Sequence, residues 1–389
     1  MYPTFSDLLY DLLGVQIPLP IQMFGLMVAI AFLIGNYVIG LELKRKYHQG
    51  LISSHFTTVT EGLPASLSEI LSNAFFGFIV GFKLFFLIGS YAQFTANPQA
   101  ALLSFEGSFL GGIFASIAMA YWAYYEKNSQ KLTQPITKQI NVMPYEVMGN
   151  LTIMAAVFGI LGAKVFHNLE NLDTFLADPI GSLLSFSGLT FYGGLICGFT
   201  AAIWYANKKN IKTIHLLDAA APGIMLAYGI GRLGCQLSGD GDWGIVNTTP
   251  KPSFISFLPD WVWSYKFPHN VISDGIPIPG CIGNHCMELP LPVYPTSLYE
   301  AILSILLFGV LWSIRKQIKI PGLLFSIYFM MNGMERFLIE KIRINNIMKF
   351  AGLKFTQAEL IATIIFLIGF TSSIYLILQN KKKNGTIAA

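Results

Sequence analysis

Residues 214–244 read IHLLDAAAPGIMLAYGIGRLGCQLSGDGDWG. Most of this stretch, residues 214–235, is an apolar run long enough to cross a bilayer as a helix, which takes about 20 residues. Arg232 lies near the end of the run, and glycines and two aspartates follow it. A charged side chain in a membrane helix costs at least ~2.5 kcal/mol at mid-bilayer unless it is paired or hydrated. The stretch therefore indicates a membrane helix with a functional charge near one end.

The composition extends this interpretation to the whole chain. Of its 389 residues, 53% are apolar and 12% are charged, whereas soluble domains usually have about 25% charged residues. Nine apolar runs of spanning length occur, at residues 20–43, 70–92, 108–126, 146–167, 188–206, 214–235, 296–314, 321–343 and 357–379. We therefore predict an all-α polytopic membrane protein with about nine transmembrane helices.

Two other interpretations lack support in the sequence. No block of basic residues with interleaved aromatic residues is present, so nucleic acid is not an expected partner. The first 20 residues carry neither a basic segment nor a cleavage signal, so we expect no signal peptide.

Basic residues alternate sharply between the loops on the two sides of the membrane. Fifteen lysines and arginines follow the first, third, fifth, seventh and ninth runs, and four occur in the other loops. The positive-inside rule then places the N-terminus outside and the C-terminus in the cytoplasm. We expect a multi-pass protein of the bacterial cytoplasmic (inner) membrane.

The chain also contains an internal repeat. Residues 79–107 align without gaps to residues 160–188, and 12 of the 29 pairs are identical, including Lys83 with Lys164 and Pro98 with Pro179. FLGG at 109–112 then matches FYGG at 191–194. Apolar helices can resemble one another by chance, but shared lysine, proline and glycine at fixed offsets argue against that. We predict that 70–126 is an inserted duplicate hairpin.

These boundaries divide the chain into five segments. The predicted segments are 1–69 with the first span, the duplicate hairpin 70–126, core spans 145–235, a small extracytoplasmic head 236–295, and C-terminal core spans 296–389. In the head, Cys281 and Cys286 form a disulfide, stay as free thiols, or bind a metal weakly with His285.

Ionisable residues inside the predicted spans are the candidates for function. Asp218 caps a helix or acts in the site, and for Lys83 and Lys164 a structural role is the favoured interpretation. Two further groups near the outer side stand out, Arg232 with Glu300 and Arg336 with Glu340. The last two, with Arg343, share one helix face if the helix continues that far. These charges form either an ion-pair lattice between helices or an anion site. The anion site is an alternative because arginine binds phosphate through two parallel hydrogen bonds.

At this point several motifs resemble the prolipoprotein diacylglyceryl transferase family. GRLGCQLSGDGDWG at 231–244 is similar to its Gly-Arg-x-Gly signature, which ends in Trp-Gly. FGLM at 24–27, GAKVF at 162–166, FYGGL at 191–195, YPTSLYE at 294–300 and the Arg336–Glu340 pair match further family motifs in the family's order. The resemblance covers residues 20–40 and 145–345. It implies transfer of the diacylglyceryl group of phosphatidylglycerol to the lipobox cysteine of a prolipoprotein signal peptide, without metal or cofactor.

The resemblance also assigns roles to residues, with departures from the family pattern. Tyr192 and Tyr294 replace two family histidines, and Cys235 replaces an asparagine, so the identity of the base is open. The expected catalytic residues are Tyr192, Asp240, Asp242, Glu300 and Arg336. The expected substrate-binding residues are Arg232, Gly193, Gly194, Gln236, Tyr299 and Glu340.

Other functions compete with the transferase hypothesis. A transporter or flippase for an anionic solute or lipid would use the same arginines together with the repeat. A catalytically altered relative or a membrane scaffold is also compatible with the sequence. Membrane lipids are expected partners in each case.

Overall fold

The nine longest helices of the computed structural model coincide with the nine predicted runs. The structure describes residues 1–15, 17, 19, 21–96, 101–102, 104–185, 190–345, 347–350 and 353–387. The long helices are α2 (Met23–His48), α3 (Leu67–Gly89), α6 (Phe109–Ser129), α7 (Met148–Glu170), α10 (Phe191–Lys208), α11 (Thr213–Ser238), α12 (Thr296–Ile314), α13 (Leu323–Glu340) and α14 (Gln357–Ile387). Within the described residues, six of them (α2, α3, α7, α11, α12 and α14) are long and apolar enough to cross a membrane. The prediction of an all-α polytopic membrane protein is confirmed.

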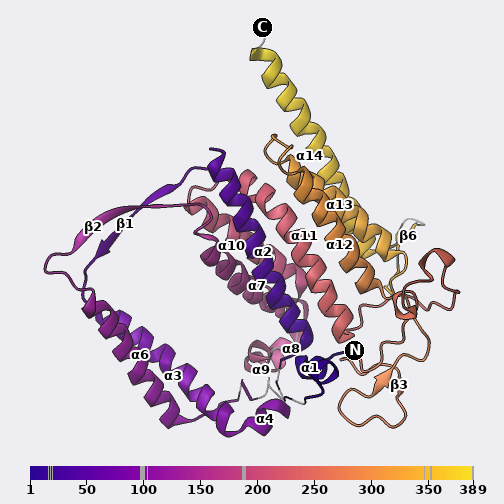
Figure 1. Cartoon of the computed structure of the whole chain (residues 1–389), viewed down its shortest axis with the longest axis horizontal. Helices are drawn as coiled ribbons and strands as arrows, with labels where there is room; N and C mark the ends of the chain where they lie inside the picture. Colours follow the sequence, from indigo (N-terminus) through magenta and orange to yellow (C-terminus); the bar gives the residue numbers. More distant parts are fainter. Residues whose placement is uncertain are drawn as a thin grey trace.

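Helix α11 is the centre of the bundle. It packs against α2 on one side and against α12 and α13 on the other, while α7 pairs with α10 and α14 with α13 (Figure 1). Half of the most apolar stretch of α11 is buried, which is more than in any other candidate span within the described chain. Small residues permit this burial, since Ala219 and Ala221 are fully buried. Gly223 allows the close approach of α2, and Gly229 that of α12. The helix that carries Arg232 is therefore the most constrained element of the fold.

Residues 239–295, which we call the head, fold against one end of the bundle, the head end. Trp243, Phe267, Leu289 and Val293 form its core. Its short elements are η1 (Ser253–Ile255), η2 (Asp260–Val262), β3 (Ile276–Pro277) and β4 (Met287–Glu288). The disulfide between Cys281 and Cys286 is formed, as one of the predicted alternatives has it.

The ends of two helices differ from the sequence prediction. Helix α11 continues to Ser238, so the head begins three residues later than expected. Helix α13 ends at Glu340, so Arg343 lies beyond the helix, contrary to the predicted span 321–343. The cause is backbone pairing with the head, since the Ile245 N–H donates to the Ile342 carbonyl (2.9 Å) and Gly244 pairs with Arg343.

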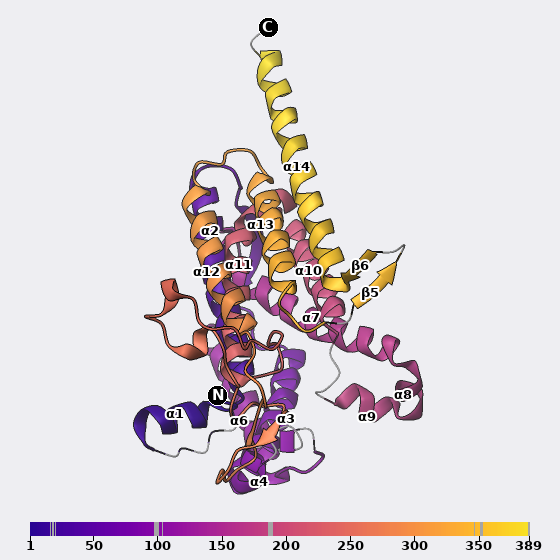
Figure 2. The ribbon, with the colours of Figure 1, turned by 90° about the vertical axis from the view of Figure 1, so that its right-hand side faces the viewer.

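The chain ends lie at opposite ends of the bundle. The N-terminus, preceding α1 (Phe5–Leu13), lies at the head end, and α14 carries the C-terminus away from it (Figure 2). Two short strands, β5 (Ile347–Phe350) and β6 (Leu353–Thr356), precede α14.

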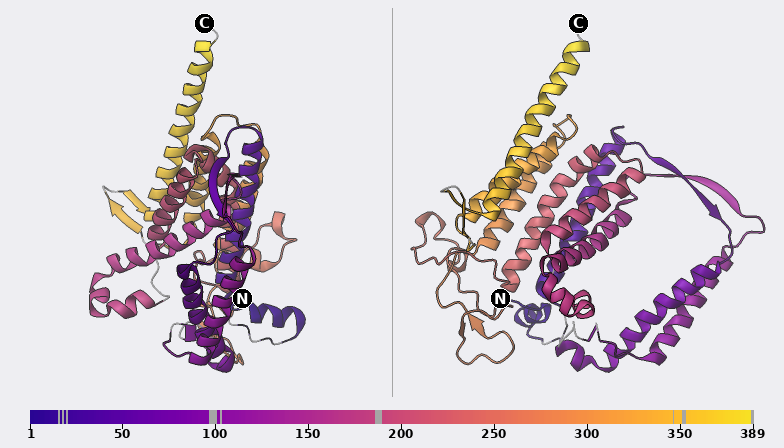
Figure 3. Two further views of the ribbon diagram at one scale, coloured as in Figure 1. Left: turned by 90° about the vertical axis from the view of Figure 1, so that its left-hand side faces the viewer. Right: turned by 180° about the vertical axis from the view of Figure 1, so that it is seen from behind.

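Helices α3 and α6 form a hairpin that stands away from the bundle. The strands β1 (His55–Glu61) and β2 (Ile136–Val142) pair in antiparallel fashion, from His55 opposite Val142 to Glu61 opposite Ile136, and connect this hairpin to the other helices (Figure 3). The short helix α4 (Tyr91–Ala96) follows α3. The outer surfaces of both helices are apolar and exposed, as lipid-facing surfaces are.

This hairpin repeats the packing of α7 and α10. Gly81 of α3 lies so close to α6 that a β-carbon would collide with the Gly111 carbonyl, and Gly162 of α7 has the same relation to the Gly193 carbonyl of α10. Small residues at such crossings let membrane helices approach closely. The two crossings use the positions that the sequence repeat aligns.

The loops of the two hairpins are also held alike. The ammonium of Lys83 donates to the Ser104 hydroxyl (3.2 Å) and to nearby carbonyls, and the ammonium of Lys164 donates to the Ser185 hydroxyl (2.9 Å) and carbonyl (2.7 Å). The preferred structural role of both lysines is confirmed, since each binds the loop that closes its hairpin. Pro98 and Gly188, which also belong to the repeat, lie outside the described residues.

Candidate active site

Three arginines converge on one buried carboxylate at the head end of α11, α12 and α13. Glu300 of α12 is fully buried. Its Oε2 lies 2.6 Å from Arg232 Nε, and its Oε1 lies 2.7 Å from Arg336 Nη1 and 3.3 Å from Arg343 Nη1. The site therefore joins two of the predicted arginines to the predicted glutamate and adds Arg343 from beyond α13.

Two further acids complete the cluster. Asp242 of the head accepts from Arg232 and from Arg343 Nη2 (2.5 Å). Glu340 Oε2 lies 3.2 Å from Arg336 Nη2, one helical turn away. We call these six residues the ion-pair cluster: Arg232, Arg336, Arg343, Asp242, Glu300 and Glu340. Its three positive and three negative charges balance.

The arginines of the cluster can be reached from outside, unlike the glutamates. Side-chain exposure is 18% for Arg232 and 23% for Arg336, against 0% for Glu300. The Asp242 side chain is 30% exposed, so an incoming anion would meet this carboxylate as well as the guanidinium groups. The cluster links three helices as an ion-pair lattice would, and it also presents two arginines to a ligand.

Asp240 and Asp242 stand in different electrostatic environments. Burial alone would raise the pKa of Asp242, but Arg232 and Arg343 outweigh burial and hold its pKa below the usual range. Burial raises the pKa of Asp240, which accepts a hydrogen bond from the Cys235 thiol. Asp240 forms no ion pair within the described chain. Its carboxylate lies within 4.8 Å of the Asp242 carboxylate and of the Cys235 sulfur. Asp240 is the better proton acceptor of the two.

The predicted residues around the cluster hold it to its surroundings. The Ser297 hydroxyl donates to Gln236 Oε1 (2.8 Å), which ties α12 to α11. The Tyr299 hydroxyl donates to the Val262 carbonyl (2.8 Å) and so binds the head to α12. Thr356 donates to Glu340 Oε1 (2.7 Å). In the structure Gln236 and Tyr299 join the elements that carry the cluster, Glu340 pairs with Arg336, and their contact with a substrate stays a prediction.

The predicted residues of α10 lie on a different helix pair. Gly193 and Gly194 turn their open faces to α7, where Phe166 and Gly162 pack against Gly193, so the glycines serve helix packing. Tyr192 is 42% exposed near the start of α10. Helix α10 packs mainly against α7, whereas the helices of the ion-pair cluster are α11, α12 and α13. The proposed roles of Tyr192 and the two glycines therefore stay predictions.

Asp218 has a structural role at the opposite end of the bundle. Its carboxylate accepts from the backbone N–H groups of Gly322 (2.8 Å) and Phe325 (3.1 Å), and Lys46 lies 3.3 Å away. Asp218 thus caps the start of α13, which is one of its two predicted roles, although the helix it caps is not its own.

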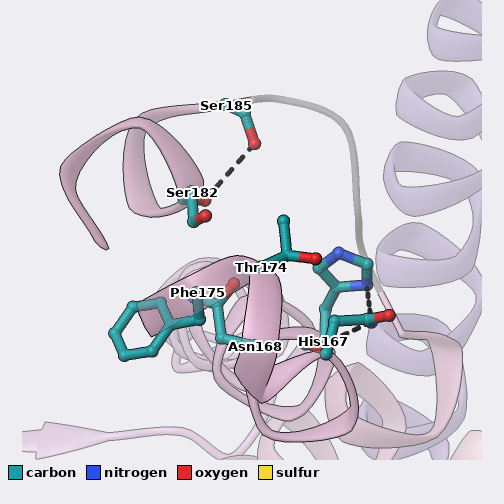
Figure 4. A pocket seen from close by; sticks show the side chains of 7 residues that line it. His167, Asn168, Thr174, Phe175, Ser182 and Ser185 are labelled. Carbon is teal, nitrogen blue, oxygen red and sulfur yellow. Dashed lines mark hydrogen bonds between the residues drawn. The ribbon is translucent and has the colours of Figure 1, made fainter. Parts of the chain in front are cut away.

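A cavity of about 150 Å³ lies away from the arginines, where α7 meets the short helices α8 (Leu172–Ala177) and α9 (Pro179–Leu184). Figure 4 shows its polar lining, with His167 and Asn168 from α7 opposite Ser182 and Ser185. This lining contains none of the residues predicted for the site.

Comparison with known proteins gives the geometry a context. The prolipoprotein diacylglyceryl transferase family matches residues 130–375, more than half of the chain. The chain belongs to this family. The matched range includes α7 to α13 with the ion-pair cluster, and it begins after the α3–α6 hairpin.

Individual relatives agree with this assignment. The phosphatidylglycerol–prolipoprotein diacylglyceryl transferase of Staphylococcus haemolyticus is 28% identical over 222 residues, 57% of this chain and 70% of the relative. The protein of the same name from Dehalococcoides mccartyi is 29% identical over 242 residues, 61% and 80% of the two chains. That from Vibrio vulnificus is 33% identical over 188 residues, 47% and 58%.

The site also contains one acid that no sequence motif indicated. Glu335 of α13 precedes Arg336 and is only 2% exposed. Residues 336, 340 and 343 were predicted to share one helical face, and residue 335 does not lie on that face. The signal that could have found it is the spacing of residues 324, 328 and 335, which places Glu335 on the face of α13 that carries Leu324 and Tyr328.

Proposed function

We propose that this protein transfers the diacylglyceryl group of phosphatidylglycerol to the thiol of a lipobox cysteine, the first step of bacterial lipoprotein maturation. Family membership and the names of the relatives support this reaction. The observation that carries it is the pair of partly exposed arginines, Arg232 and Arg336, held by one buried glutamate. Arginine binds phosphate through two parallel hydrogen bonds, and phosphate at headgroup depth belongs to phospholipids.

Lipid binding proceeds by exchange of anions. The phosphate of the lipid replaces carboxylate oxygens of Glu300 and Asp242 as the partner of Arg232 and Arg336. The arginines then stabilise the charge that grows on the phosphate as its bond to carbon breaks, because they are already oriented before the reaction.

The thiol of the prolipoprotein cysteine must lose a proton to attack carbon. Asp240 takes this proton, since it forms no ion pair with the arginines in the described chain and burial raises its pKa, whereas the arginines keep Asp242 in its ionised and weakly basic form. Tyr192 is the alternative acceptor named by the sequence. It lies on α10 and a phenol is a weaker choice at neutral pH.

The setting of the reaction is the bacterial cytoplasmic membrane with the head outside and the C-terminus in the cytoplasm. The distribution of basic residues supports this orientation. The signal-peptide helix of the prolipoprotein binds between helices, and its cysteine reaches the head end. No metal or organic cofactor takes part.

The test is a transfer assay with purified protein, phosphatidylglycerol and a lipobox peptide, read by peptide mass and by release of glycerol phosphate. We expect a diacylglyceryl mass gain that disappears when the peptide cysteine is replaced by serine. Lipid binding without mass gain, under conditions in which an active relative turns over, would show a catalytically altered member of the family. Movement of an anion across vesicles without transfer would instead support a transporter.

A further inference from the structure

The interface of α11, α12 and α13 is built in layers along the helix axes. Its inner layer is apolar and contains Met225, Leu311, Leu324 and Tyr328. The ion-pair cluster forms the layer at the head end. Between the two lies a third layer, which we call the middle layer and which contains Tyr228, Ser304 and Glu335.

Helical spacing places these three residues at the same level of the interface, and Tyr228 interacts electrostatically with Glu335. Glu335 lies seven residues after Tyr328, and Ser304 seven before Leu311, so each continues a face that already points into the interface. Gly229 of α11 lies against Ser304, since a β-carbon there would come 3.2 Å from the Ser304 β-carbon. Gly333 faces α14, and Glu335, two residues on, faces away from α14.

The middle layer contains polar atoms without partners. Both carboxyl oxygens of Glu335 and the hydroxyl of Ser304 are buried without a hydrogen-bond partner in the part of the chain that the structure describes. Glu335 is 2% exposed and Ser304 0%. Burying such atoms costs free energy unless water or a ligand forms hydrogen bonds with them, so the middle layer favours the binding of a polar group.

Charge balance determines the protonation of Glu335. The groups that interact with it are Tyr228 and Arg232 of α11, Glu300 of α12, Tyr328 and Arg336 of α13, and Arg343 beyond α13. The three arginines of this site are already neutralised by Asp242, Glu300 and Glu340. A fourth carboxylate would be an uncompensated buried charge beside Glu300, whereas a neutral acid avoids that cost.

We propose that Glu335 is a protonated acid that gives its proton to the phosphate group as that group leaves the diacylglyceryl carbon. This inference rests on the proposed function. The thiol S–H bond breaks and its proton goes to Asp240, the sulfur–carbon bond forms, and the carbon–oxygen bond to phosphate breaks with its electron pair on the phosphate. Glu335 protonates the departing phosphate, and the proton held by Asp240 later restores Glu335 through solvent. The sum is a thiol and a lipid converted to a thioether and glycerol phosphate, without oxidant or reductant.

The experiment compares wild type, Glu335→Gln and Glu335→Asp in the transfer assay across the neutral to alkaline range. Wild-type kcat falls as pH rises, because the acid loses its proton. Glutamine copies the size and neutrality of the protonated acid but cannot donate a proton to phosphate in this way. We expect Glu335→Gln to retain lipid binding and thermal stability and to lose about 10²-fold in kcat at neutral pH. Its kcat should not fall further as the pH rises.

A second substrate separates proton donation from a structural role. The sulfate ester of diacylglycerol has a leaving group that needs no proton, so wild type and Glu335→Gln should transfer it at equal rates. The inference is overturned if Glu335→Gln transfers from phosphatidylglycerol at the wild-type rate, or if it keeps the alkaline decline. If Glu335→Gln does not fold, Glu335→Asp decides, since it must keep the decline. Failure of wild type to transfer at all would instead refute the proposed function.

Discussion

Two guanidinium groups form the proposed binding site for the lipid phosphate. Arg232 and Arg336 approach the same glutamate from two helices, at 2.6 Å and 2.7 Å, so a phosphate that replaces the carboxylate meets both. Lysine keeps the charge and loses the fork that binds two phosphate oxygens.

Replacement of either arginine by lysine should therefore reduce transfer by about 10²-fold, mainly in kcat. The transfer assay measures this effect, with lipid binding followed in parallel. Lys266→Arg in the head, where the charge pairs with Glu288, is the matched control and should have little effect. Full activity of Arg232→Lys would show that a point charge suffices and that bidentate phosphate binding is wrong.

Asp240 is the residue for which pH dependence is most informative. Burial raises its folded-state pKa above 3.8, so the carboxylate that accepts the thiol proton is present only above that raised value, and transfer should fall as pH drops through it. Asp240→Asn should lose about 10²-fold or more in kcat and lose this acid limb. Tyr192→Phe is the comparison variant. If Tyr192→Phe loses the activity and Asp240→Asn keeps it, the base lies on α10.

At the scale of elements, the sequence predicts the helices well because burial in lipid leaves a strong signal. All nine runs became helices, with ends displaced by at most eight residues. Arg343 illustrates the limit: apolar spacing continues past Glu340, but pairing with the head ends the helix there. Local patterns do not contain such long-range contacts.

The candidate site was predictable in part for the same reason. Arg232 and Glu300 are isolated charges in apolar helices, and Arg336 lies within an apolar run, so the cost of burying them indicated function. Glu335 was overlooked because it stands beside Arg336, and only the packing shows that it faces a different layer. The glycines at 193–194 matched a ligand-binding motif, yet their open faces meet α7.

The crossing of α7 and α10 gives a prediction at this scale. Leucine at Gly162 would collide with Cys197 and the Gly193 carbonyl, and separation of the two helices should lower the unfolding temperature and the transfer rate together. Gly149→Leu on the same helix meets nothing within 4 Å and serves as the control. The equivalent change in the other hairpin, Gly81→Leu, should spare transfer. Equal loss in both hairpins would mean that α3–α6 also supports the reaction.

At the scale of the whole molecule, the α3–α6 hairpin repeats the α7–α10 packing without the charges of the site. His55 and Val142 face each other at the base of the ribbon, so residues 56–141 can be replaced by a two-residue Asn-Gly turn without displacing α2 or α7. We expect the shortened protein to fold and to transfer at a rate near that of wild type, as measured by thermal unfolding and the transfer assay. Loss of transfer in a folded protein would assign the hairpin a part in substrate binding.

The proposed reaction requires the lipid phosphate to lie between Arg232 and Arg336. The most direct test is an experimental structure of the protein with phosphatidylglycerol bound in a lipid nanodisc. We expect phosphate density within hydrogen-bond distance of both guanidinium groups, with Glu300 or Asp242 displaced from at least one of them. Phosphate density beside Tyr192 on α10, with every ion pair of the cluster intact, would contradict it and would mean that the arginines only join the helices.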